Sequence, residues 1–66
     1  MTVLDYCLMV QKGVLAARPE RSDTYFDLWF ADTGRASTAV SNALDGRDDV
    51  ALRVAEVLAE RYHVVE

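Results

Sequence analysis

The chain has 66 residues, enough for one domain, residues 1–66, with a modest hydrophobic core. Its 11 acidic and 7 basic residues give a formal net charge of −4, which counts against nucleic-acid partners in general, because phosphate neutralisation normally supplies much of their affinity. A single cysteine, Cys7, excludes an internal disulfide and suits a cytoplasmic protein. Charged residues interrupt the apolar runs, so we expect neither a signal peptide nor a membrane span.

The first predicted helix covers about residues 2–17, where apolar side chains recur at helical spacing. Thr2 is a suitable N-cap, and Pro19 predicts an end near Ala17 because the residue before a proline disfavours helical geometry. Cys7 lies within the apolar positions of this helix, so we expect a buried thiol.

A second helix is predicted over about residues 24–33, with Ser22 or Asp23 as its N-cap. Four aromatic residues fall at helical spacing within it and are expected to form the centre of the core: Tyr25, Phe26, Trp29 and Phe30. Gly34 is expected to end this helix, because glycine tolerates the left-handed backbone of a sharp turn.

A short third helix over about residues 36–45 should end at Gly46, and a fourth should begin at Asp48 or Asp49. The inward positions expected in the fourth helix are Val50, Ala51, Val54, Ala55, Val57, Leu58 and Tyr62. The sequence therefore predicts an all-α fold, a compact bundle of four, or at most five, short helices.

A glycine turn that joins a helix to a short following helix is the arrangement of a helix-turn-helix, whose second helix enters the DNA major groove. Residues 35–44 contain no carboxylate, although the chain as a whole is acidic. The outer face of this predicted recognition helix offers hydrogen-bond donors for phosphates or base edges: Arg35, Ser37, Thr38, Ser41 and Asn42.

The segment GRASTAVSNALDG, residues 34–46, resembles the turn and recognition helix of the Cro/repressor-type (XRE-like) and lactose-repressor families. Six positions separate Gly34 from Val40, and six more separate Val40 from Gly46, as in those families. The resemblance implies that Val40 is buried and that Arg35 lies near a phosphate. It also implies groove contacts from Ser37, Thr38, Ser41 and Asn42, and a backbone contact from Arg47.

By this resemblance, the chain would be a small sequence-specific transcriptional regulator, a phage or prophage type of repressor. We expect a homodimer on a palindromic operator in double-stranded DNA, with its two recognition helices about 34 Å apart.

The alternative hypothesis is an acidic protein with a helix-turn-helix fold that binds another protein, for example a phage-encoded inhibitor of a host defence or transcription complex. It is motivated by the net charge and by Arg35 as the lone basic residue of the predicted recognition face. The acidic side chains that would contact a basic groove are Asp45, Asp48, Asp49, Glu56 and Glu60.

Nothing in the sequence predicts an enzyme, a cofactor or a metal site. Cys7 and the single histidine, His63, lie near opposite ends of the chain, and no glycine-rich phosphate loop is present.

Overall fold

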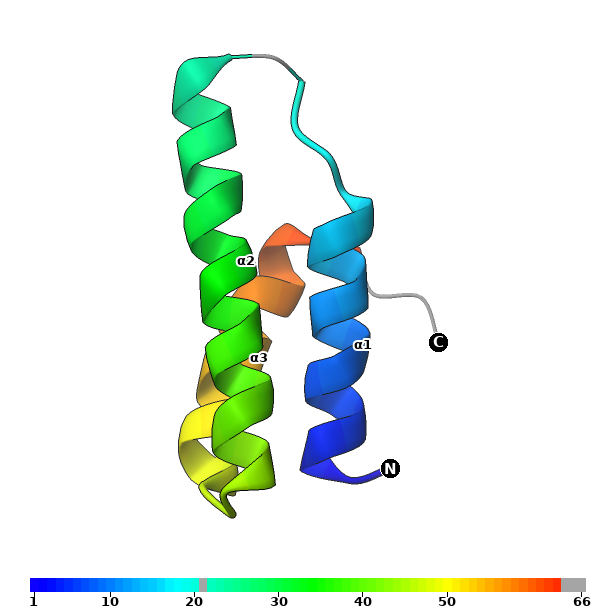
Figure 1. Cartoon of the computed structure of the whole chain (residues 1–66). Coiled ribbons are helices and arrows are strands. Elements are labelled where there is room, and N and C mark those ends of the chain that lie inside the picture. Colours follow the sequence, from blue (N-terminus) through cyan, green and yellow to red (C-terminus); the bar gives the residue numbers. More distant parts are fainter. Residues whose placement is uncertain (21, 64–66) are drawn as a thin grey trace.

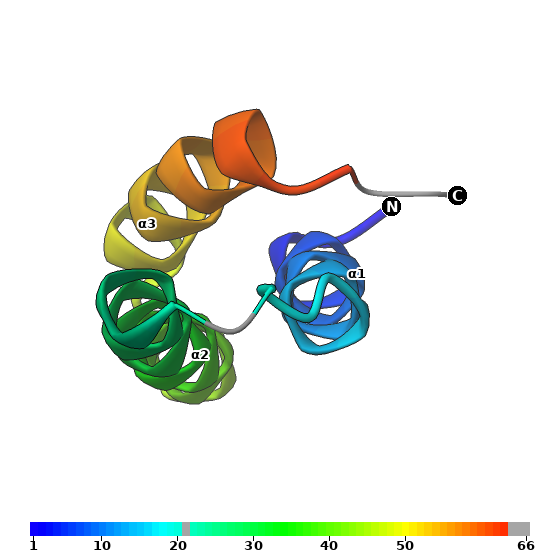
Figure 2. The same cartoon turned by 90° about the horizontal axis from the view of Figure 1, so that it is seen from above.

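The computed structural model describes residues 1–20 and 22–63, which form three helices (Figure 1). α1 (Val3–Ala16) leads through a linker to α2 (Asp23–Leu44), and a tight turn connects α2 to α3 (Asp48–Arg61). Each helix contacts the other two, and the view from above shows them around a common centre (Figure 2). The predicted all-α fold is confirmed. Among the described residues, no helix combines the length and the apolar character that crossing a membrane would require.

Local hydrogen bonds begin the first two helices as the sequence predicted. Thr2 and Asp5 form a capping box: Thr2 Oγ1 accepts from the Asp5 amide at 3.1 Å, and the Thr2 amide donates to the Asp5 carboxylate at 3.3 Å. Ser22 Oγ accepts from the Tyr25 amide at 3.4 Å. α1 ends at Ala16, within one residue of its predicted end.

Gly46 ends α2, also as predicted. Its φ of 77° is left-handed, and its amide donates to the Ala43 carbonyl at 3.2 Å. The Arg47 amide donates to the Asn42 carbonyl at 2.8 Å, which completes a Schellman motif. α3 then begins at Asp48 and runs back along α2.

The turn predicted at Gly34 is absent, because Gly34 lies inside α2, a single helix of 22 residues. The described residues with positive φ comprise Gly46 only, so Gly34 keeps ordinary helical geometry. A glycine inside a helix costs about 1 kcal/mol relative to alanine. Packing of α2 against both α1 and α3 outweighs that cost. The expected four or five helices are therefore corrected to three in the described chain.

The core is built mainly from small side chains, and four of its eight members are alanines. Small residues allow neighbouring helices to approach closely. The buried apolar residues are Cys7, Val10, Val14, Ala36, Ala39, Ala51, Ala55 and Leu58. Val50 and Val57, predicted to face inward, are exposed, because α3 turns its alanines and Leu58 toward the other helices.

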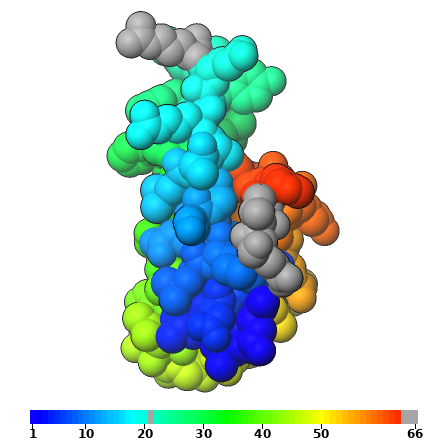
Figure 3. Space-filling model, turned by 90° about the vertical axis from the view of Figure 1, so that its right-hand side faces the viewer, coloured from blue at the N-terminus to red at the C-terminus, as the bar shows by residue number. Residues whose placement is uncertain are grey.

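The aromatic side chains predicted at the centre of the core lie outside it. Tyr25 and Phe30 are each 66% exposed and Phe26 is 52% exposed, whereas Trp29 is half-buried. The cause is helix length: α3 has 14 residues and ends beside Asp32, so α2 extends about 12 Å beyond it. Figure 3 shows the residues that follow α1 and the start of α2 extending beyond α3.

Candidate functional site

The residues predicted to contact DNA lie on the second half of α2, with Arg47 at the start of α3. At about 100° per residue, Arg35 and Ser37 point to opposite flanks of α2. Arg35 borders α3, whereas Ser37 faces α1, where Gln11 Nε2 donates to its hydroxyl at 3.2 Å. Val40, predicted to be buried, is half-buried against the core. The predicted contact residues therefore spread over about half of the helix circumference.

Hydrogen bonds within α2 already use two of the predicted DNA-contacting groups. Thr38 Oγ1 donates to the Gly34 carbonyl at 3.0 Å, and Asn42 Nδ2 donates to the Thr38 carbonyl at 3.0 Å. Ser41 and Arg47 are exposed. The Thr38 hydroxyl can still accept a hydrogen bond, and Asn42 keeps its Oδ1 acceptor and a second Nδ2 proton for contact with a base edge.

A second candidate surface, here called the aromatic surface, covers the end of the bundle beyond α3. It consists of Leu15 from α1 and of Tyr25, Phe26, Trp29 and Phe30 from α2. The ring centroid of Phe26 lies 6.0 Å from that of Trp29 and 6.0 Å from that of Phe30. The centroids of Trp29 and Phe30 are 6.4 Å apart. These separations lie in the range of favourable aromatic pairs, so the rings support one another.

Trp29 fixes the aromatic surface to α1. Its indole Nε1 donates to the Val14 carbonyl at 2.9 Å. Val14 belongs to the last turn of α1, where backbone carbonyls lack partners within their own helix. The bond therefore satisfies a helix end and holds the indole between α1 and α2.

Two shallow hollows in the aromatic surface share Trp29. One is lined by Leu15, Arg18, Pro19, Phe26 and Trp29. The other is lined by Trp29, Phe30, Thr33, Gly34 and Ser37. Exposed carboxylates of Asp23 and Asp27 accompany the rings along this part of α2. The surface thus combines apolar concavities, one of which is also lined by Arg18, with two carboxylates along α2.

Asp32 forms a buried ionic cluster where α3 ends. Arg35 Nη1 donates to Asp32 Oδ1 at 2.8 Å, Arg61 Nη1 donates to Oδ1 and Oδ2 at 3.0 and 2.9 Å, and the Tyr62 hydroxyl donates to Oδ2 at 2.9 Å. Burial, the largest single influence, raises the pKa of Asp32, but the bonds from Tyr62, Arg61 and Arg35 and the charge of Arg61 outweigh it. The pKa of Asp32 therefore lies below its ordinary value.

Neither Cys7 nor His63 belongs to a metal site in the part of the chain that is described. Cys7 is fully buried and its thiol donates to the Ala51 carbonyl at 3.7 Å. No group of three or more His, Cys, Asp or Glu side chains among residues 1–20 and 22–63 could hold a metal ion.

The sequence matches no family model, and no curated protein or solved structure is significantly similar to it.

Sequence reasoning missed the aromatic surface, although a signal for it exists. In a single helix, Ala36, Ala39 and Ala43 define the inward stripe, and Phe26 and Phe30 lie about 80–120° away from Ala36. This signal can be used only when Gly34 is placed inside the helix. A break at Gly34 would leave the direction of the side chains before it undefined relative to the direction of those after it.

Proposed function

We propose that this chain is an acidic interaction domain that binds a basic partner protein through the aromatic surface. The observation that carries the proposal is the distribution of side-chain size. Tyr25, Phe26 and Phe30 are each more than half exposed, while alanines fill much of the core. Contiguous exposed apolar groups commonly mark interaction sites, and aromatic residues are enriched among those that dominate binding energy.

The aromatic surface is suited to binding because Phe26, Trp29 and Phe30 contact one another and Trp29 is hydrogen-bonded to α1. The hydrogen bond from Trp29 to Val14 and the contacts between the rings restrict their motion. Ordering a side chain on association costs about 0.5–1.5 kcal/mol. A partner that covers rings held in place loses less entropy than one that must order them.

Charge favours a basic partner over a second copy of the chain. Asp23 and Asp27 border the rings, and the chain carries a net charge of −4. A symmetric dimer through this surface would bring these carboxylates together, whereas lysine or arginine on a partner would complement them. The predicted homodimer is thus one outcome of the test below.

DNA binding, the first prediction from the sequence, is retained as a second candidate function. The supporting observation is that α2 carries no carboxylate from Thr33 to its end at Leu44. Its mechanism would differ from the expected one, because α2 would present the middle and end of a long helix rather than a short helix after a turn.

The test compares three proteins: the parent chain, the double variant Phe26→Ser/Phe30→Ser, and the control Leu8→Ser, which removes an exposed apolar side chain from α1. Partners captured from an extract of the source cells are purified, and their affinity for each protein is measured by calorimetry. We expect a basic partner whose affinity falls at least about tenfold with the double variant and is unchanged with the control.

Trp29 supplies a direct signal, because it is the only tryptophan and lies half-buried in the surface. Its emission should shift to shorter wavelength when the partner covers it. Equal affinity for all three proteins would refute the proposal. A dimer that dissociates in the double variant would reassign the surface to self-association. Salt-sensitive enrichment of a duplex from a random library would favour DNA binding.

A further inference from the structure

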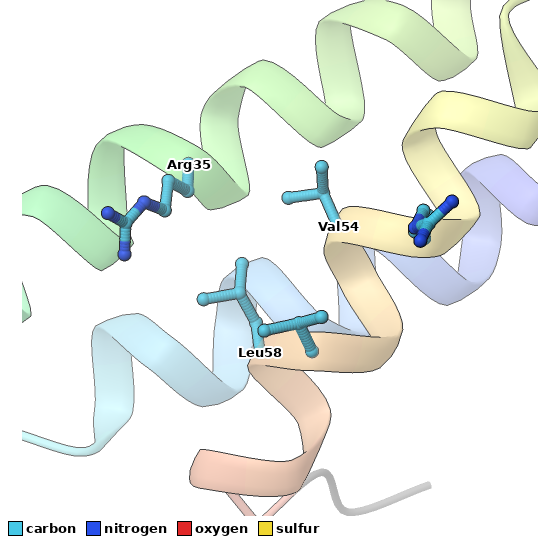
Figure 4. A pocket seen from close by; sticks show the side chains of 5 residues that line it. Arg35, Val54 and Leu58 are labelled. Atoms are coloured by element: carbon cyan, nitrogen blue, oxygen red, sulfur yellow. The ribbon is translucent and has the colours of Figure 1, made fainter.

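A groove between α2 and α3 is lined by two arginines and three aliphatic residues. Its composition differs from that of the aromatic surface. We call it the arginine groove, and it comprises Arg35, Arg53, Val54, Val57 and Leu58. Figure 4 shows Val54 and Leu58 on α3 and the Arg35 side chain extending from α2 beside them. No carboxylate lines this groove, although the chain is acidic overall.

The buried Asp32 carboxylate orients guanidinium groups whose outer parts remain in solvent. The side chains of Arg35 and Arg61 are 57% and 50% exposed, whereas that of Asp32 is 2% exposed. Each guanidinium has five N–H donors, and Asp32 occupies only some of them. The negative charge therefore lies beneath the surface, and free donors of Arg35 and Arg61 face outward.

Arg53 adds a positive charge that forms no direct ion pair with the described residues. No carboxylate of residues 1–20 or 22–63 lies within 4.0 Å of its guanidinium nitrogens. Asp49 and Glu56, four residues before and three residues after Arg53 on α3, are exposed, so the positive charge is confined to the lining of the groove, where no carboxylate lies. An anionic segment narrow enough to contact that lining would find complementary charge in the groove and repulsion from the carboxylates around it.

The floor of the groove is apolar. Val57 is 51% exposed, and Val50, one α-helical heptad earlier, is 44% exposed. Val54 and Leu58 continue the aliphatic lining toward the core. A ligand that complements the groove therefore needs aliphatic groups as well as negative charge. A phosphate backbone alone does not provide the aliphatic groups.

We propose that the arginine groove binds an acidic amphipathic segment of a partner protein. Carboxylates of the segment pair with Arg53 and with the outward donors of Arg35, and its aliphatic side chains cover Val54 and Val57. Arg35 is held by Asp32 through one Nη1 hydrogen bond before binding, which lowers the cost of ordering its other N–H donors against a carboxylate. The two surfaces would make this chain a bridge between a basic and an acidic partner, but the groove does not depend on the aromatic surface for its function.

The test is selection of peptides from a random 16-residue library displayed on phage, against the parent chain, Arg53→Glu and Lys12→Glu. Lys12→Glu is the matched control, because it makes the same charge change at an exposed position of α1. We expect the parent and the control to enrich peptides with Glu or Asp beside Leu, Ile or Val. Arg53→Glu should lower their affinity at least about tenfold.

A selected peptide is then titrated into isotopically labelled protein and followed by NMR. Amide shifts should change at Arg53, Val54 and Val57 and not at Phe26 or Phe30, and the affinity should fall as salt rises from about 0.05 to about 0.5 M. A peptide with Gln in place of each acidic residue should bind more weakly.

Three results would overturn the proposal: no enrichment that depends on Arg53, enrichment of basic peptides, or tighter binding of a DNA duplex than of any peptide at these residues. Peptides lost with Phe26→Ser/Phe30→Ser but kept with Arg53→Glu would also refute it while supporting the aromatic surface. Failure of the groove and failure of the aromatic surface are therefore distinguishable.

Discussion

The Tyr62 hydroxyl donates a hydrogen bond to Asp32 Oδ2 at 2.9 Å, across 30 positions of sequence. This contact, with the ion pair from Arg61, ties the end of α3 to the middle of α2. Beyond that point the start of α2 has no α3 beside it, and its aromatic side chains are exposed. Arg35, which also bonds to Asp32, lines the arginine groove between α2 and α3. One buried carboxylate thus contacts both the end of α3, beyond which the aromatic surface lies, and Arg35 of the arginine groove.

The Asp32 cluster predicts a loss of stability in acid. The pKa of Asp32 is lower in the folded chain than its unfolded value of about 3.9. The cluster therefore stabilises the fold fully above that value, and its contribution is lost as pH falls through the unfolded and then the folded pKa. Asp32→Asn should lower the free energy of unfolding by about 1–3 kcal/mol at pH 7. The substitution should also make the free energy of unfolding fall less steeply between about pH 5 and pH 3.

Urea unfolding followed by circular dichroism at several pH values measures both effects. Asp27→Asn is the control, because it removes an exposed carboxylate from the same helix. If Asp32→Asn retained the acid dependence of the parent chain, the cluster would not be its source.

The two glycines of the α2 and α3 hairpin should respond to alanine in opposite directions. Gly34 is helical, and a Cβ there would meet nothing within 4 Å, so Gly34→Ala should stabilise the fold by about 1 kcal/mol. Gly46 has a φ of 77°, so Gly46→Ala should destabilise it by about 1–2 kcal/mol. Thermal and urea unfolding measure both. Destabilisation by Gly34→Ala would indicate a turn in place of a continuous helix.

Cys7 should be unreactive in the folded chain. Burial, reinforced by the negative charge of Asp48, raises the pKa of the thiol and disfavours the thiolate that reacts. We expect labelling by Ellman's reagent to be slow at pH 8 and fast in denaturant, with the rate following the free energy of unfolding. Rapid labelling of the folded chain would show that α1 separates readily from Ala51.

Core and surface positions of α2 should tolerate changes in size very differently. Ala39 is 1% exposed, so Ala39→Leu should overpack the helix contacts and cost about 1–3 kcal/mol. Phe30→Ser removes a whole aromatic ring, but that ring is 66% exposed. The resulting loss of unfolding free energy should therefore stay below about 1 kcal/mol. Chemical denaturation compares the two. A larger loss for Phe30→Ser would place the ring in the core.

The sequence by itself determined the class of fold and most helix ends. Thr2, Ser22 and Gly46 act on backbone groups within a few positions, so their capping roles follow from local chemistry. The periodic apolar positions likewise predicted helices over most of the chain. Candidate donors such as Arg35 and Ser41 were also correctly expected to be exposed, although their proposed contact with DNA stays a prediction.

Only the tertiary structure decided whether Gly34 ended a helix and which side chains were buried. A glycine penalty of about 1 kcal/mol is smaller than the packing energy available to a helix that contacts two others. Phe26 and Phe30 have the helical spacing that is typical of core residues, but α3 does not extend far enough to cover them. Their exposure therefore depends on where α3 ends. The end of α3 is held to α2 by the bonds of Arg61 and Tyr62 to Asp32, which lies 29 and 30 positions before them and meets them only in the folded chain.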